Sequence, residues 1–418
     1  MSISFRKKLG YRLYAALYDI CRLLPIRDRQ AYFVMTHDSS AEGNCGVMLS
    51  LMQSRGFTCF TLTRAETASP RFILKSAPAL ARSRYVFLDN AFLPLAFFKV
   101  RRGTSVIQLW HGTGTVKKFG QHVNTGELKA LEARCGRNIS TVVVSSEATR
   151  SLYAECFGVP VEKVQILGLP RTDIFFDKDF PARARAAFRE NFKFILYAPT
   201  FRDDPADEQT QLERISEFVT AFKAEMPADT VLGLRLHPSL AGQLQLSPTE
   251  QLCSAPAKQS QSVAEAQITV GRLQPGVLYQ NAFGRPQSEV EHCTESVASS
   301  PMVLDLSNYS GINTLLGAAD VLITDYSSII FEYALLRRPM LFYAYDLERF
   351  ENNDRGFYRD YRSYVPGPVS TDIRKLMADL KAAMAQPGSL SFDSFIRDSY
   401  AFTDGRSAER VLNYVLKL

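Results

Sequence analysis

Short apolar runs alternate with amphipathic segments from about residue 30 to the end of the chain. The short runs are rich in β-branched and aromatic residues and predict strands, whereas the segments between them carry apolar residues at helical spacing. This alternation is typical of parallel sheets covered by helices on both faces. The predicted strands are 31–36, 57–63, 84–90, 104–110, 141–146, 164–168, 192–200, 230–238, 302–306, 320–324 and 340–343.

These strands form two groups, and we therefore predict an α/β protein with two Rossmann-like domains, at 30–180 and 181–400. Amphipathic helices are predicted before them, within 1–29, and after them, at 401–418. The segment 241–300 interrupts the pattern, because nine of its 60 residues are Gln and eight are Ser. We expect an insert in the second domain that is either functional or mobile.

The N-terminal segment predicts a basic amphipathic helix, and its charged residues interrupt any signal-peptide core. A helix lying on an anionic membrane and a helix packed on its own domain explain this pattern equally well. The apolar stripe consists of Leu9, Leu13, Leu17, Ile20 and Leu24, and the tyrosines suited to an interface are Tyr11, Tyr14 and Tyr18.

Composition narrows the classes of protein. A net charge of +6 on 418 residues suits anionic substrates or an anionic membrane surface, and equally an ordinary surface; it gives no sign of nucleic-acid binding. The seven cysteines form no C-x-x-C pair and the five histidines are scattered, so zinc spacing is absent. Reduced thiols in a cytosolic protein are expected. No apolar run reaches the length of a membrane span.

The segment 319–343 carries the strongest sign of a ligand site. It predicts a buried strand, a polar loop and a helix, with Asp325, Ser327 and Ser328 in the loop. The first N–H groups of a helix lack partners and its dipole favours negative charge. We therefore predict that this loop binds a phosphate, which points to a nucleotide-linked substrate.

A second candidate site follows the strand at 104–110. His111 lies at the strand exit, where α/β sheets bind ligands, and Gly112 lets the backbone approach a substrate. Thr113 and Lys117 are further predicted substrate contacts. His111 is equally consistent with a general base and with a histidine that merely caps the turn.

Other polar residues follow strands of the second domain. His237 and Arg235 share one strand face by two-residue alternation, an arrangement that suits a pyrophosphate, although a structural histidine before a proline fits equally well. Thr200 and Arg202 are predicted to reach a phosphate. Their neighbours Asp203 and Asp204 we interpret as surface residues and not metal ligands.

Two arginines, Arg171 and Arg355, lie outside these strand ends. For Arg171 and Asp173 we predict a local ion pair or turn contact near the domain junction. Arg355, beside Gly356, suits bidentate binding of a phosphate, although a solvated charged loop is the more common explanation. Walker A, G-x-G-x-x-G and G-x-S-x-G patterns are absent, which argues against P-loop NTPases, nicotinamide dehydrogenases and α/β-hydrolases.

Together these segments resemble the CDP-glycerol glycerophosphotransferases, the primases and polymerases of wall teichoic acids and related capsule phosphopolymers. The resemblance spans roughly 85–415 apart from the insert. Its segments, in family order, are QLWHGTGTVKKFG (108–120), GLPRTDIFF (168–176), YAPTFRDD (197–204), LRLHP (234–238), LITDYSSIIFEY (322–333), YAYDLE (343–348), DRGFY (354–358) and AFTDGRSAERVLNYVL (401–416).

The resemblance implies a GT-B-like fold in which the two domains face a central cleft. It implies transfer of glycerol phosphate from CDP-glycerol to a hydroxyl of a lipid-linked saccharide or growing polyol-phosphate chain, with release of CMP and without metal or cofactor. By motif, His111 matches the catalytic base and His237 the histidine that stabilises the donor pyrophosphate. Ser327 and Ser328 match phosphate-binding serines, and Arg355 matches the arginine that neutralises the leaving nucleotide.

It also implies a peripheral protein on the inner face of a bacterial cell membrane. The absence of a large extra N-terminal domain favours a primase or short polymerase. Three alternatives stay open: a CDP-ribitol-type transferase, a GT-B glycosyltransferase that uses a nucleotide sugar, and a non-catalytic scaffold. The acceptor and the oligomeric state, a homo-oligomer included, are also left open by the sequence.

Overall fold

The computed structural model describes most of the chain. The predicted insert 241–300 lies outside the described residues except for Gln243 and Ser300. The described residues are 3–186, 188, 192–202, 205–237, 240, 243, 300–309 and 311–418.

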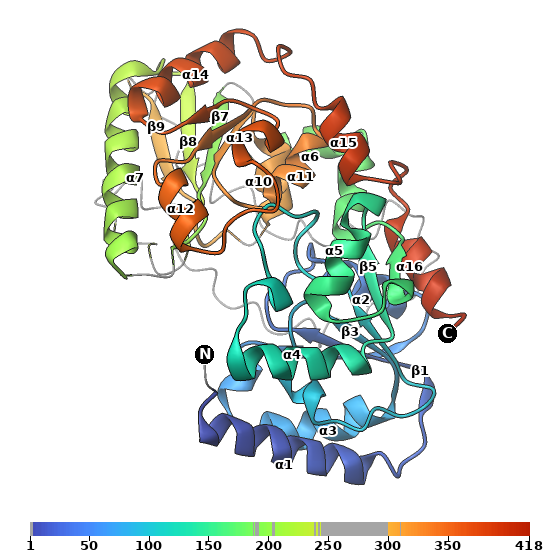
Figure 1. The fold of residues 1–418 in the computed structure, drawn as a ribbon. Coiled ribbons are helices and arrows are strands. Elements are labelled where there is room, and N and C mark those ends of the chain that lie inside the picture. The colour runs from blue at the N-terminus through green and yellow to red at the C-terminus, as the bar shows by residue number, and fades with distance from the viewer. Residues whose placement is uncertain are drawn as a thin grey trace. The chain divides into compact units, whose positions relative to one another are not determined.

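The chain divides into two compact units, each built on one sheet (Figure 1). Unit 1 comprises Met1–Asp177, Arg355–Tyr358 and Ser394–Leu418, and unit 2 comprises Lys178–Asp354 and Arg359–Asp393. The chain therefore passes between the units several times. This division into compact units does not test the domain boundaries at 180 and 400, which remain predictions.

Unit 1 is built on a six-stranded parallel sheet in the order β2-β1-β3-β4-β5-β6. The strands are β1 Arg27–Met35, β2 Thr58–Thr63, β3 Ser83–Leu88, β4 Ser105–Gln108, β5 Thr141–Val144 and β6 Val164–Ile166. Its helices are α1 Phe5–Cys21, α2 Asn44–Ser54, α3 Phe72–Arg82, α4 Gly126–Asn138, α5 Glu147–Phe157 and α16 Ser407–Val415. Shorter 3-10 turns are η1 Glu66–Ala68, η2 Leu93–Ala96, η3 Gly120–His122, η4 Val161–Lys163 and η5 Pro170–Phe176.

Unit 2 repeats the plan with the order β12-β11-β10-β7-β8-β9, again all parallel. Its strands are β7 Lys193–Ala198, β8 Thr230–Leu234, β9 Met302–Asp305, β10 Val321–Thr324, β11 Met340–Tyr343 and β12 Val369–Ser370. Its helices are α6 Phe180–Ala186, α7 Pro205–Glu225, α10 Ile312–Ala318, α11 Ile329–Ala334, α12 Leu347–Asn353, α13 Tyr361–Tyr364 and α14 Ile373–Ala385. Helix α15, Asp393–Ser399, begins where the chain returns to unit 1.

Every predicted strand overlaps a strand of the structure, so these predictions are confirmed. The strand predicted at 230–238 is shorter than expected, because β8 ends at Leu234. Strand β12 was not predicted, since two residues are too short to display a periodicity.

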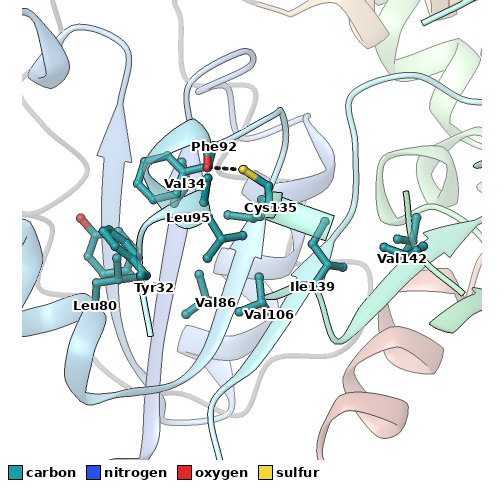
Figure 2. Packing of buried hydrophobic residues seen from close by; sticks show 14 of the residues in the cluster. Tyr32, Val34, Leu80, Val86, Phe92, Leu95, Val106, Cys135, Ile139 and Val142 are labelled. Carbon is teal, nitrogen blue, oxygen red and sulfur yellow. Dashed lines mark hydrogen bonds between the residues drawn. The ribbon is translucent and has the colours of Figure 1, made fainter. Parts of the chain in front are cut away.

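The core of unit 1 follows from the alternation of side chains along its strands. Tyr32 and Val34 of β1 point to the same face, where they join one buried cluster with Val86 of β3 (Figure 2). Helix α4 and the η2 turn close over that face, and the Cys135 thiol donates to the carbonyl oxygen of Phe92 at 3.5 Å.

Helix α1 packs on unit 1 through its tyrosine face. Tyr14 and Tyr18 are buried; Tyr18 stacks on Phe98 at 4.4 Å, and the Ser76 hydroxyl donates to the Tyr14 hydroxyl at 2.7 Å. Packing of this helix on its own domain is thus confirmed. Most of the leucine stripe nevertheless stays in solvent, and Ile20, for example, is 65% exposed. None of the helices within the described residues is both long and apolar enough to cross a bilayer.

Candidate active site

The loop after β4 carries His111 on a constrained backbone. Trp110 has a φ of 57°, in the left-handed region that non-glycine residues rarely occupy. The Gln108 side-chain oxygen accepts from the Trp110 N–H at 2.9 Å, and the indole stacks on Phe119 at 5.1 Å. The Tyr153 hydroxyl lies 3.1 Å from the carbonyl oxygen of Gly112. These contacts hold the turn in one conformation.

One hydrogen bond determines the tautomer of His111. Its Nδ1 lies 2.9 Å from the carbonyl oxygen of Asp89. A carbonyl only accepts, so Nδ1 carries the hydrogen and Nε2 keeps its lone pair. Burial first, and then the neighbouring His37 ring, lower the pKa of His111 to about 3; Arg171 and Lys117 act in the same direction. His111 is therefore neutral at physiological pH and presents Nε2 as a base.

His37 and Asp89 support this imidazole from the loops after β1 and β3. The His37 ring stacks on His111 with centroids 3.6 Å apart. The Asp89 carboxylate accepts the backbone N–H groups of Thr36, His37 and Asp38 at 3.0, 3.0 and 2.8 Å. Burial raises the pKa of Asp89 to about 6, against the lowering effect of those bonds. Asp89 thus ties both histidine loops together, through its side chain and its carbonyl.

Sequence reasoning missed His37 and Asp89. The signal was present, since His37 directly follows the predicted strand 31–36 and Asp89 lies near the end of the predicted strand 84–90. Asn44 was also missed, and its signal is weaker because it begins a helix. Its amide donates to the carbonyl of Trp110 at 3.0 Å, and its oxygen accepts the Arg171 N–H at 3.0 Å.

The local ion pair or turn contact predicted for Arg171 and Asp173 is wrong, because both side chains bond to residues that are distant in the sequence. The Arg171 guanidinium donates to the carbonyl oxygen of His111 at 2.8 Å. The Asp173 carboxylate accepts the backbone N–H groups of Ser407 and Ala408, both at 2.8 Å, and so caps the start of α16.

Arg355 belongs to the segment Arg355–Tyr358 of unit 1, although both flanks of that segment belong to unit 2. The Lys118 N–H donates to the Gly356 carbonyl at 3.1 Å, and the Tyr358 hydroxyl lies 3.0 Å from His122 Nδ1 and from the Cys156 sulfur. These bonds hold the segment 355–358 against the loop that follows His111. The exposed Arg355 lines a cavity together with His37 and His111.

That cavity lies within unit 1 and has a volume of about 390 Å³. Thr113, in contrast, is fully buried, and Gly112 is buried as well. Their position favours a role in shaping the loop over the substrate contacts predicted for their side chains. Lys117 is half-buried, and its backbone pairs with that of Phe357 in an isolated antiparallel β-bridge.

In unit 2, a buried ionic network occupies the residues predicted to hold phosphate. Arg202 is 3% exposed; its Nε lies 2.7 Å from Asp346 Oδ2 and its Nη2 lies 3.0 Å from Asp325 Oδ2. The remaining Nη1 donates to the carbonyl of Thr200 at 2.6 Å. Since its donors are engaged inside the protein, the geometry favours a supporting role for Arg202 over the predicted phosphate contact.

The network positions two loops beside each other. Asp325 Oδ1 accepts the backbone N–H groups of Thr200 and Tyr326 at 2.8 and 2.6 Å. Asp325 is therefore also a supporting residue. The Thr200 hydroxyl is buried and has no hydrogen-bond partner among the residues that the structure describes, and Ser327 and Ser328 are half-buried in the same loop region. Helix α11 after the serines is only six residues long.

Arg235 and His237 lie beyond the end of β8 and so do not share a strand face as predicted. The Arg235 guanidinium donates to the carbonyls of Leu306, at 3.1 Å, and Ser307. His237 is exposed and its ring stacks on Phe201 at 4.1 Å. Arg235 thus braces the segment after β9, while the His237 ring is accessible.

The structure gathers the predicted residues into two groups, one on each unit. His111, Lys117 and Arg355 lie in unit 1 with Gly112 and Thr113. The unit 2 group consists of Thr200, Arg202, Arg235, His237, Asp325, Ser327 and Ser328. No group of three His, Cys, Asp or Glu residues suited to a metal occurs within the described part of the chain.

A family model described as CDP-Glycerol:Poly(glycerophosphate) glycerophosphotransferase matches residues 16–265 and 288–417. Among curated proteins, the chain is 28% identical to the teichoic acid poly(ribitol-phosphate) polymerase of Bacillus spizizenii, covering 99% of this chain and 60% of that protein. It is 29% identical to the teichoic acid ribitol-phosphate primase of the same organism, covering 80% of this chain and 75% of the primase. It is 26% identical to the teichoic acid glycerol-phosphate primase of Bacillus subtilis, covering 84% of this chain and 78% of that primase.

Among solved structures, the wall teichoic acid polymerase TagF has a TM-score of 0.71 at 20% identity, over 99% of this chain and 97% of that one. A TagF variant with CDPG gives 0.70 at 19% identity, over 100% and 98%. Together with the two parallel sheets, this similarity confirms the predicted α/β, GT-B-like fold class.

Proposed function

Because the chain belongs to the CDP-glycerol:poly(glycerophosphate) glycerophosphotransferase family, we propose that it transfers a polyol phosphate from a CDP-activated donor to an acceptor hydroxyl. The acceptor oxygen forms a bond to the phosphorus nearest the polyol, the bond from that phosphorus to CMP breaks, and His111 Nε2 takes the hydroxyl proton. CMP leaves as an anion. The chain supplies positioning and charge and forms no covalent intermediate.

The state of His111 is the observation that carries this proposal. Its Nδ1–H is committed to the Asp89 carbonyl, so Nε2 is the free base beside a cavity that Arg355 also lines. A pKa near 3 makes a weak base in the free protein. The negative charge of a substrate phosphate at Arg355, which lines the same cavity of unit 1, favours the imidazolium and raises that pKa, so substrate binding activates the base.

On the donor side, we assign phosphate contacts to the Thr200 hydroxyl, Ser327, Ser328 and His237. Support comes from the unpartnered Thr200 hydroxyl and from the exposed His237 ring. Arg202, Asp325 and Arg235 act through these residues by holding their loops.

The donor can carry one of two polyols, glycerol or ribitol. The family description names glycerol, and we propose CDP-glycerol as the donor. CDP-ribitol is the second candidate, because the two relatives at 28% and 29% identity are ribitol-phosphate enzymes. A teichoic acid or capsule-type polymer is the proposed product.

The decisive assay is release of CMP by the purified protein from CDP-glycerol, CDP-ribitol and a UDP-sugar, with and without a glycerol-phosphate oligomer. We expect acceptor-dependent release from a CDP-polyol and a loss of about 10²–10⁴-fold for His111→Ala. Circular dichroism checks that the variant is folded. Turnover of the UDP-sugar alone, or full activity of His111→Ala, would refute the proposal.

We further propose that α1 binds an anionic membrane surface from the cytoplasmic side. At 100° per residue, the exposed Phe5, Leu9, Leu13 and Ile20 form one face, opposite the buried Tyr14. Arg6 and Arg12 flank that face and are exposed. Such a helix binds by apolar burial combined with attraction to anionic lipids.

Flotation with phosphatidylglycerol and phosphatidylcholine vesicles tests this proposal. Leu13→Gln/Ile20→Gln should weaken binding to anionic vesicles at least tenfold, whereas Leu416→Gln, an exposed leucine on α16's end, should not. Point changes are preferable to removal of α1, which would expose the partners of Tyr14 and Tyr18. Equal flotation of both variants would refute it. A homo-oligomer remains a proposal that light scattering can test.

A further inference from the structure

The cavity in unit 1 has a polar wall that the proposed chemistry does not use. Glu132 of α4 and Asn124, just before α4, both line it. The Asn124 amide donates to Glu132 Oε2 at 2.7 Å, and the Gln121 amide lies 3.5 Å from the same oxygen. Glu132 Oε1 takes part in neither bond.

The floor of this cavity, in contrast, is apolar. Phe92, Leu95, Cys135 and Ile139 line the cavity and also belong to the hydrophobic core of the unit (Figure 2). The cavity thus extends from the two stacked histidines to the core. Its volume of about 390 Å³ exceeds that of a few water molecules and suits a small ligand.

From this arrangement, which rests on the proposed function, we infer that the cavity is the acceptor subsite and that Glu132 and Asn124 bind the uncharged, hydroxyl-bearing end of the acceptor beside His111. A carboxylate accepts hydrogen bonds from hydroxyl groups strongly, and an amide both donates and accepts. The apolar floor packs against the C–H groups of the same polyol or sugar.

The charges that line the cavity determine which end of the acceptor enters it. Burial raises the pKa of Glu132, so its carboxylate is already costly to ionise in this wall. A phosphate group beside it would add repulsion between like charges. The exposed Arg355 is the cationic group lining the cavity, and it is suited to the first phosphate behind the terminal hydroxyl. The subsite therefore selects a free hydroxyl terminus and excludes a phosphorylated one.

The test is calorimetric binding without donor, using a glycerol-phosphate trimer that keeps its free terminal hydroxyl. Glu132→Gln keeps an oxygen for Asn124 but removes the charge, and Val123→Phe adds bulk to the cavity wall. We expect both to weaken binding at least tenfold. Glu162→Gln, an exposed glutamate outside the cavity, is the matched control and should bind as the natural protein does.

A second probe carries a phosphate monoester on that terminal hydroxyl. It should bind the natural protein at least tenfold more weakly than the first probe, and Glu132→Gln should narrow that ratio. No binding of the first probe to the natural protein, or binding within twofold in both cavity variants, would overturn the inference. Because no donor is present, these outcomes are separate from failure of the proposed transfer, which appears as absence of CMP release from every CDP-polyol.

Discussion

Replacing Arg202 by methionine should destabilise unit 2 strongly. The substitution removes three contacts of 2.7, 3.0 and 3.0 Å to Asp346 and Asp325 and leaves two carboxylates without their cation. Breaking a buried ion pair costs about 3–5 kcal/mol, because the remaining charge is desolvated and unpaired. Asp325 is 1% exposed, which places the expected loss within that range.

Hydrogen exchange in urea, followed in peptides from β7 and β10, measures this loss. The protein has a single tryptophan, Trp110 in unit 1, so its emission reports unit 1 separately and should be unchanged. Arg214→Met is the matched control, since Arg214 is an exposed arginine paired with Glu217 on α7. An exposed pair of this kind contributes about 0–1 kcal/mol.

A loss below about 1 kcal/mol, combined with a tenfold rise in KM for the donor, would refute the supporting role and restore the phosphate contact.

Two further predictions concern unit 1. Asp173→Ala should lower its free energy of unfolding by about 2 kcal/mol and speed hydrogen exchange in α16, because two N–H groups at the helix start lose their acceptor; unchanged exchange would contradict this. kcat/KM should stay level from pH 8 down to pH 5.5, because burial and the His37 ring lower the pKa of His111 to about 3. A fall centred near pH 6.5 would show a solvated histidine instead. Since the unfolded chain takes up that proton first, the stability of unit 1 should decrease below pH 6.5.

Local pattern accounts for much of what was predicted correctly. Apolar runs such as Val321–Thr324 identify strands because both faces of a parallel sheet are buried. Strand ends identify His111, because parallel sheets bring their carboxyl ends to one edge. The tyrosine face of α1 was recognised as suited to an interface, although periodicity alone left its partner open.

What failed depends on partners distant in the chain. Arg202 was expected to bind phosphate, and nothing near it in sequence indicates the Asp346 carboxylate 144 residues away. The segment Arg355–Tyr358 lies between residues of unit 2 in the sequence, and contacts that include the bonds of Gly356 and Tyr358 join it to unit 1. The tautomer of His111 depends on a backbone carbonyl, a group that every residue carries and that no sequence motif marks.

The cap on α16 has a consequence for synthesis of the protein. The Asp173 carboxylate can form this cap only after Ser407, 234 residues later in the chain, has been synthesised. At about 5–20 residues per second, that interval lasts roughly 10–50 s on the ribosome. Throughout it, the surfaces of α2 and η5 against which α16 packs are uncovered, and the carboxylate lacks its two amides. The first unit is therefore incomplete until α16 has been synthesised, and a frameshift between Tyr358 and Ser407 would remove this helix while leaving every residue that lines the cavity unchanged.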